Sequence, residues 1–282
     1  MNVLGEAASA VFGVASALAW GAGDFFGGLS TKRTSVNRVV VGSQVVGMIA
    51  LIVLAFVFRE PFPPSRSVVW GAAAGLSGAI GLLALYSALA KERMGLAAPV
   101  SGVLAAALPV ALTAITGGLP GPLTMAGFAV ALVAVWLVSR SADATFQWNA
   151  LGLPLLAGCG FGGFIILIGN TEPGAVFWPL VAARVASLSV LTMLALSRRE
   201  PAWPARGHWP VIAGAGIFDA GGNLFLVLAA HTGRLDVAAV LSSLYPAGTV
   251  LLAWWVLHER LTRSQTVGLV ASLIAILAIS IR

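Results

Sequence analysis

Three ionisable side chains stand inside long apolar stretches of the sequence: Asp24, Arg184 and Asp219. Such a group costs about 2.5–3.5 kcal/mol to place at membrane depth, so each needs a reason to be there. The planar guanidinium of Arg184 could bind both oxygens of a substrate carboxylate, while Asp24 or Asp219 neutralises a substrate ammonium. Alternatively, Arg184 pairs with one aspartate and only locks two helices together. Asp24 could also carry a proton.

Neutral polar residues at or near the middle of the same stretches could donate or accept hydrogen bonds to a substrate. They are Gln44, Tyr86, Asn223, Ser243 and Tyr245. Gln44 stands 140 residues before Arg184, and Asn223 follows Asp219 by one helical turn, on the same face. Hydrogen bonding between helices is the alternative role for these residues.

Two tryptophans could stack on a flat apolar substrate. Trp20 comes one turn before Asp24, so one helical face would carry an aromatic wall and a carboxylate. Trp178 lies near the start of another apolar stretch. Trp20 could equally be a packing residue. Together with the eight polar residues, these tryptophans form the predicted substrate-binding set.

The composition shows what kind of element must hold these residues. Of 282 residues, 59% are hydrophobic and 9% charged, and the mean hydropathy is +0.97. So few charges cannot cover a water-facing surface, which predicts an all-α integral membrane protein in contact with the lipid bilayer. Ten apolar runs are long enough to cross it: 8–29, 37–58, 68–90, 95–115, 122–139, 150–169, 175–197, 209–230, 235–257 and 264–281.

The same composition excludes other classes of site. Although the net charge is +6, the basic residues stand singly or in twos between apolar runs, so no nucleic-acid partner is expected. Cys159 is the one cysteine, and the three histidines lie far apart near the ends of runs. This spacing is not that of a zinc site, and we expect no metal and no cofactor.

Short motifs recur about 140 residues apart. Arg59-Glu60-Pro61 after the second run returns as Arg199-Glu200-Pro201 after the seventh, and Trp70, Gly75, Pro109 and Gly127 match Trp209, Gly214, Pro246 and Gly268. This order predicts two five-helix repeats, residues 1–140 and 141–282. Because five is odd, the second copy enters from the opposite face, which makes a five-plus-five inverted repeat of the kind found in secondary transporters. Chance similarity between two apolar stretches is the alternative.

Two kinds of residue predict how these helices pack and bend. Gly23 and Gly27, Gly71 and Gly75, and Gly158 and Gly162 are spaced to let helices touch closely. Pro109 and Pro246 would kink or locally unwind their spans, as hinges or as plain curvature.

Several motifs resemble the EamA branch of the drug/metabolite transporter superfamily. Trp20-Gly21, with Lys32 at the far end of the first run, is similar to its opening signature. Leu241-Ser242-Ser243-Leu244-Tyr245-Pro246, the stretch from Trp254 to Thr262, and Gly268 resemble the closing signature of its second repeat. Glu259 of that stretch has no acidic counterpart at Gly117-Gly118-Leu119-Pro120-Gly121, which departs from a symmetric glutamate pair.

The resemblance implies a monomeric exporter in the bacterial inner membrane, with aromatic and other neutral amino acids as substrates and a central cavity that works by alternating access. Export of another metabolite or drug, such as a sugar, nucleoside or cationic compound, is the alternative. A membrane enzyme or a channel fits less well, because no histidine is mid-span and no polar face repeats. Eleven basic residues on one side against four on the other place both termini outside, whereas the resemblance implies cytoplasmic termini, so orientation stays open.

Overall fold

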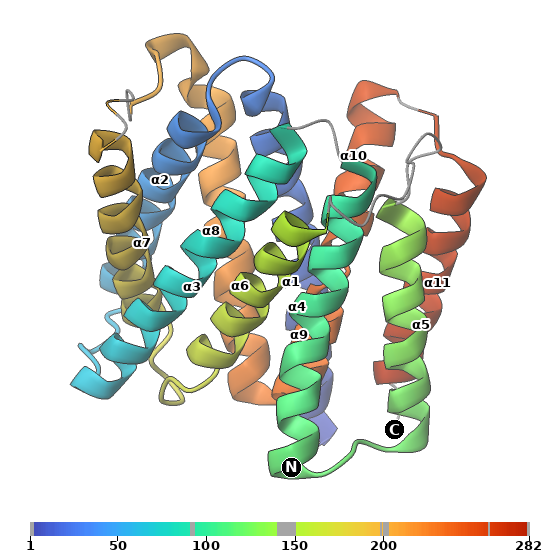
Figure 1. The fold of residues 1–282 in the computed structure, drawn as a ribbon. Helices are drawn as coiled ribbons and strands as arrows, with labels where there is room; N and C mark the ends of the chain where they lie inside the picture. The colour runs from blue at the N-terminus through green and yellow to red at the C-terminus, as the bar shows by residue number, and fades with distance from the viewer. Residues whose placement is uncertain are drawn as a thin grey trace.

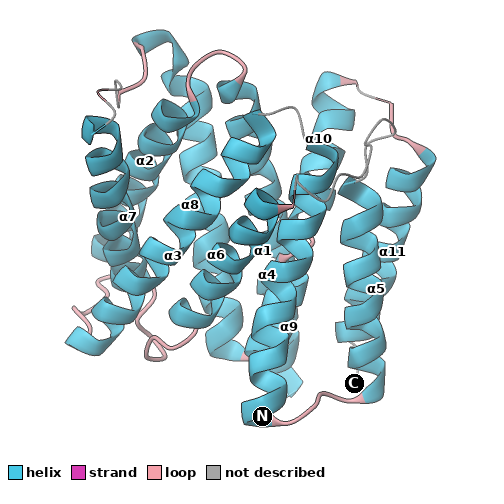
Figure 2. Cartoon of the chain, in the orientation of Figure 1, coloured by secondary structure: helices cyan, strands magenta, loops and turns pink. Residues whose placement is uncertain are grey.

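The computed structural model describes residues 3–90, 94–139, 151–197, 199, 203–258 and 260–280. Within these ranges every long element is an α-helix, and the helices stand side by side as one bundle (Figure 2). The first five are α1 (Val3–Thr31), α2 (Val36–Val57), α3 (Ser65–Ala90), α4 (Met94–Gly117) and α5 (Pro122–Ser139). They are followed by α6 (Gly152–Ile168), α7 (Phe177–Ser197), the short turn η2 (Arg206–His208), α8 (Trp209–Thr232), α9 (Leu235–Ser242), α10 (Tyr245–Leu257) and α11 (Arg263–Ser280).

The predicted apolar runs are confirmed as helices. Within the described residues, seven segments are long and apolar enough to cross a membrane, with α9 and α10 together forming one of them, and α5, α6 and α11 are shorter apolar helices. Large apolar side chains point outward from these helices; Phe56 is 68% exposed and Ile115 85%. Such a surface requires lipid around it. The chain is therefore a multi-pass membrane protein.

The ninth run is not one continuous helix. Leu244 ends the hydrogen-bonding pattern of α9 by donating to Leu241 O at 3.2 Å, and α10 restarts at Tyr245 with Pro246 in its first turn. A proline is tolerated there because the first N–H groups of a helix have no intrahelical partner. By contrast, α4 runs unbroken through Pro109. The expected unwinding is thus found at one of the two matched prolines.

The first five helices and the later ones make equivalent contacts. The equivalent helices are α1 and α6, α2 and α7, α3 and α8, α4 and the α9–α10 pair, and α5 and α11. Helix α1 packs against α8 and against the α9–α10 pair, just as α6 packs against α3 and α4. Likewise α2 contacts α8 and α7 contacts α3, while α2 packs on α7 and α5 on α11. In Figure 1, the N- and C-termini lie at the same end of the bundle, and α1 starts at the end toward which α6 runs.

Two glycines lie at equivalent places in the α3–α7 and α8–α2 contacts. A Cβ on Gly75 of α3 would overlap the backbone of Ala183 in α7, and one on Gly216 of α8 would overlap the carbonyl of Ser43 in α2. Small residues at these two positions let the helix backbones touch. The counterpart of Gly75 in this contact is Gly216 rather than Gly214, which faces Phe26.

One residue after α2 and one after α7 share an uncommon backbone conformation. Arg59 and Arg199, the first residues of the two Arg-Glu-Pro motifs, both adopt left-handed backbone angles, with φ of 52° and 54°. Few non-glycine residues do so. The first residue of the recurring motif therefore has the same backbone conformation after α2 and after α7.

Candidate substrate cavity

A partly open cavity lies among helices from both ends of the sequence, and about 830 Å³ of empty space is enclosed there together with its opening. Eight residues of the predicted set line it: Trp20, Asp24, Gln44, Arg184, Asp219, Asn223, Ser243 and Tyr245. They come from α1, α2, α7, α8, α10 and the break before α10. Polar groups that stand up to about 220 residues apart in the sequence thus face one space.

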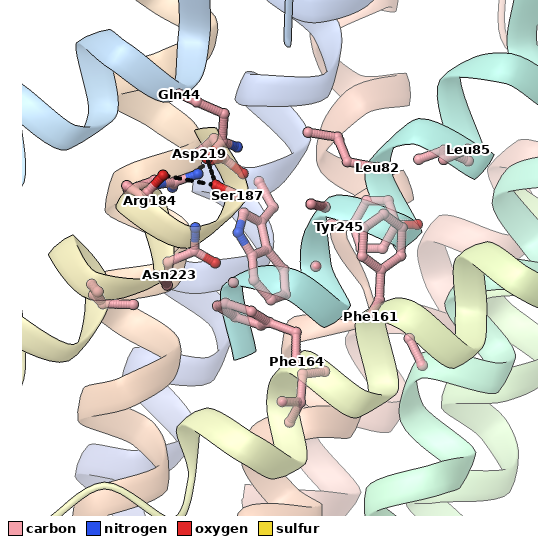
Figure 3. Close-up of a pocket in the computed structure, with 18 of the residues that line it drawn as sticks. Gln44, Leu82, Leu85, Phe161, Phe164, Arg184, Ser187, Asp219, Asn223 and Tyr245 are labelled. Carbon is pink, nitrogen blue, oxygen red and sulfur yellow. Dashed lines mark hydrogen bonds and ion pairs between the residues drawn. The ribbon is translucent and has the colours of Figure 1, made fainter. Parts of the chain in front are cut away.

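One end of the cavity is polar. Figure 3 shows Gln44, Arg184, Ser187, Asp219 and Asn223 gathered there. Arg184 Nη2 lies 2.6 Å from Asp219 Oδ2, and Ser187 donates to Gln44 Oε1 at 3.0 Å. The alternative role predicted for Arg184, an ion pair that joins two helices, is therefore present between α7 and α8.

The two partners of this ion pair are covered to different degrees. The side chain of Arg184 is 7% exposed, whereas that of Asp219 is 32% exposed. Arg184 Nη2 makes no hydrogen bond of good geometry in addition to the ion pair. The carboxylate is therefore the more exposed member of the pair.

Gln44 of α2 and Arg184 of α7 make equivalent contacts, each with the other helix of the pair. Gln44 bonds to Ser187, and a Cβ on Gly47 would lie 3.6 Å from Arg184 Nε. Arg184 and Ser187 stand 140 residues after Gln44 and Gly47, respectively. Such reciprocal contacts are those of a self-complementary interface.

The other end of the cavity is aromatic and aliphatic. Leu82 and Leu85 of α3, Phe161 of α6 and Tyr245 of α10 lie on this side in Figure 3. The indole of Trp20 stands edge-on to Tyr245, with ring centroids 6.4 Å apart and an interplanar angle of 89°. This arrangement is one that aromatic pairs favour.

Asp24 and Trp20 line the cavity from one face of α1, as their spacing predicts. Asp24 lies within electrostatic reach of both Asp219 and Tyr245. Among the residues that the structure describes, no cation pairs with Asp24 and no group hydrogen-bonds to it. Within the described part of the chain, its carboxylate therefore has no counter-charge.

Trp178 does not line the cavity. The cause is Glu60, whose carboxylate accepts backbone hydrogen bonds from Val176, Phe177 and Trp178 at the start of α7. The Trp178 indole donates to Glu60 O at 3.0 Å and packs against Phe56 and Phe62. A carboxylate at a helix N-terminus is stabilising, and here it holds Trp178 at the helix end.

Tyr86 lies on α3, but its side chain is outside the described residues, as is Glu259. Other lining residues were missed. Ser187 follows Arg184 by three residues, a spacing that could have placed it on the same face. Phe161 and Phe164 carry no local signal, since apolar residues fill every span. Within the described ranges, no three His, Cys, Asp or Glu side chains are grouped as a metal ion would require.

Comparison with known proteins gives a family match for the second part of the chain. Residues 150–281 match the EamA-like transporter family. The EamA match begins just before α6 and ends just after α11, so it includes Arg184, Asp219, Asn223, Ser243 and Tyr245. No curated protein matches the sequence.

The fold also has a solved counterpart. One crystal structure aligns with 96% of this chain over 97% of its own length, with a TM-score of 0.76 and 17% sequence identity. At this identity the likeness concerns the fold alone. It extends over both halves, whereas the EamA match covers the second.

Proposed function

We propose that the chain is a monomeric exporter of small metabolites in the bacterial inner membrane, and that its substrates are aromatic and other neutral amino acids. The observation that carries the proposal is the cavity itself, with charged and amide groups at one end and aromatic and aliphatic side chains at the other. An aromatic amino acid likewise has charged groups at one end and an apolar ring at the other. The EamA match supports transport over the enzyme alternative.

The proposed mechanism is alternating access by a five-plus-five inverted repeat, with residues 1–140 and 141–282 as its units. The exchange of helix contacts between α1–α5 and α6–α11 supports this duplication. An odd number of spans per unit makes the two copies run in opposite senses, so each half can adopt the conformation of the other. The break between α9 and α10 borders the cavity through Ser243 and Tyr245, where a hinge would act on bound substrate.

The choice of amino acids as substrates also rests on a resemblance. The signatures around Trp20 and Tyr245 resemble those of the EamA branch, and within that branch we take the chain to be most similar to the aromatic amino-acid exporter YddG. Both residues line the cavity.

Uptake into proteoliposomes of purified protein tests the proposal. Labelled phenylalanine, tyrosine and tryptophan should exchange across the membrane, measured with and without a pH gradient. Transport of a sugar or nucleoside with no transport of any amino acid would reject the proposed substrates.

Two serines of α7 provide a matched pair of variants for this assay. Ser187 lines the cavity and bonds to Gln44, whereas Ser189 is exposed and bonds only to Val185 O in its own helix. Ser187→Ala should raise the KM for amino acids, and Ser189→Ala should leave it unchanged. Equal KM values for the two variants would argue against this cavity as the transport site.

A further inference from the structure

We propose that the cavity recognises its substrate by an amino group held between the Asp24 carboxylate and the Trp20 indole, and that the substrate needs no carboxylate. This inference rests on the proposed function and refines it. The substrate class becomes primary amines that carry an aromatic ring on an alkyl chain. This class includes the aromatic amino acids and the corresponding amines that lack the carboxylate.

The charges that line the cavity lead to this inference. Among the described residues, two acidic side chains and one basic side chain line it: Asp24, Asp219 and Arg184. Arg184 and Asp219 neutralise each other across 2.6 Å. Asp24 is left without a cationic partner among the described residues. A carboxylate at membrane depth is costly unless a counter-charge is supplied, and a substrate ammonium supplies one.

The two members of the ion pair also differ in how much of each side chain is exposed. The side chain of Arg184 is almost fully covered, while Asp219 presents its carboxylate to the cavity. A substrate carboxylate would find the guanidinium of Arg184 already paired with Asp219. A substrate ammonium is attracted by the carboxylate of Asp24, which has no such partner among the described residues.

The aromatic neighbours of Asp24 suit the same ligand. Trp20 lines the cavity one turn before Asp24, and Tyr245 stands edge-on to it. The face of an indole attracts an ammonium group most strongly of the aromatic side chains. The substrate ring then lies toward Phe161, Leu82 and Leu85 at the apolar end.

Three probes that share an indole ring test this inference in proteoliposomes. Tryptophan carries both charged groups, tryptamine only the amine, and indole-3-propionate only the carboxylate. We expect tryptamine to be transported with a KM within tenfold of that for tryptophan, and no transport of indole-3-propionate. Transport of tryptophan and indole-3-propionate without tryptamine would overturn the inference and leave amino-acid export standing. Transport of none of the three would overturn both.

Variants of Asp24 test the assigned group. Asp24→Asn should raise the KM for tryptophan and tryptamine at least tenfold, and Asp24→Glu should restore most of the loss. Glu172→Gln, a change of charge at an exposed loop residue, is the matched control and should have no effect. A ligand-induced rise in unfolding temperature in detergent provides a second readout, expected with tryptamine for the wild type but not for Asp24→Asn. An unchanged KM and ligand response in Asp24→Asn would contradict the assignment.

Discussion

Gly222 of α8 offers a way to move the Trp20 indole without changing any side chain that lines the cavity. A Cβ at Gly222 would lie 2.7 Å from both Cγ and Nε1 of Trp20. The nearest atom, Trp20 Cδ1, would overlap with this Cβ. Because non-bonded carbon atoms pack at about 3.5–4.0 Å, the Trp20 indole must move by more than about 1 Å in Gly222→Ala. The native position of the Trp20 indole therefore requires a residue without a side chain at position 222.

The magnitude of the effect follows from that overlap. Overpacking a well-packed site costs about 1–3 kcal/mol, and 1.4 kcal/mol corresponds to a factor of ten in affinity. We expect Gly222→Ala to raise the KM for aromatic substrates about tenfold and to lower the unfolding temperature. The assays are uptake into proteoliposomes and thermal unfolding in detergent.

Gly221→Ala is the matched control for this prediction. Its Cβ would meet only Ala19 Cβ at 4.0 Å, an ordinary contact. Both substitutions gain the same helix propensity, about 1 kcal/mol, so this contribution cancels in the comparison. Adding Trp20→Phe to Gly222→Ala should restore the unfolding temperature, because the smaller ring leaves room for the methyl group. Identical KM values and unfolding temperatures for the two alanine variants would refute the reasoning.

Three further changes test other parts of the structure. Glu60→Ala removes the acceptor for three backbone N–H groups at the start of α7 and should cost about 1–2 kcal/mol of stability, seen as a lower unfolding temperature than that of the exposed control Glu172→Ala. Gly75→Ala places a methyl group against the backbone of Ala183 and should destabilise the protein by about 1–3 kcal/mol or more, whereas Gly28→Ala, with no atom within 4 Å, should not; similar unfolding temperatures would count against the α3–α7 contact. Pro246→Ala should slow turnover in proteoliposomes by letting α9 and α10 join, while Pro109→Ala in the continuous helix α4 should leave turnover unchanged; equal rates would show that the break is not a hinge.

Much of the fold could be predicted from the sequence because the bilayer limits the solutions. Each span must be a long apolar helix, so hydropathy alone located ten runs. The cavity residues were predictable for a related reason. Asp24, Arg184 and Asp219 are too costly to face lipid, and their shared need for shelter brings them together.

The rest depends on contacts between residues far apart in the chain. Trp178 was predicted to stack on substrate, but Glu60, 118 residues earlier, draws its indole to the end of α7. No local pattern records that pair. Nor does a matched proline determine the backbone, since the chain breaks before Pro246 and continues through Pro109.

The reciprocal contacts of Gln44 with Ser187 and of Arg184 with Gly47 place unlike residues at related positions. With the same side chain at both positions, this pair would not distinguish between the two orientations of a bound molecule. A neutral amide opposite a cation removes that degeneracy. A bound molecule would therefore meet different groups at this pair in its two orientations, although the helix contacts around the pair are reciprocal.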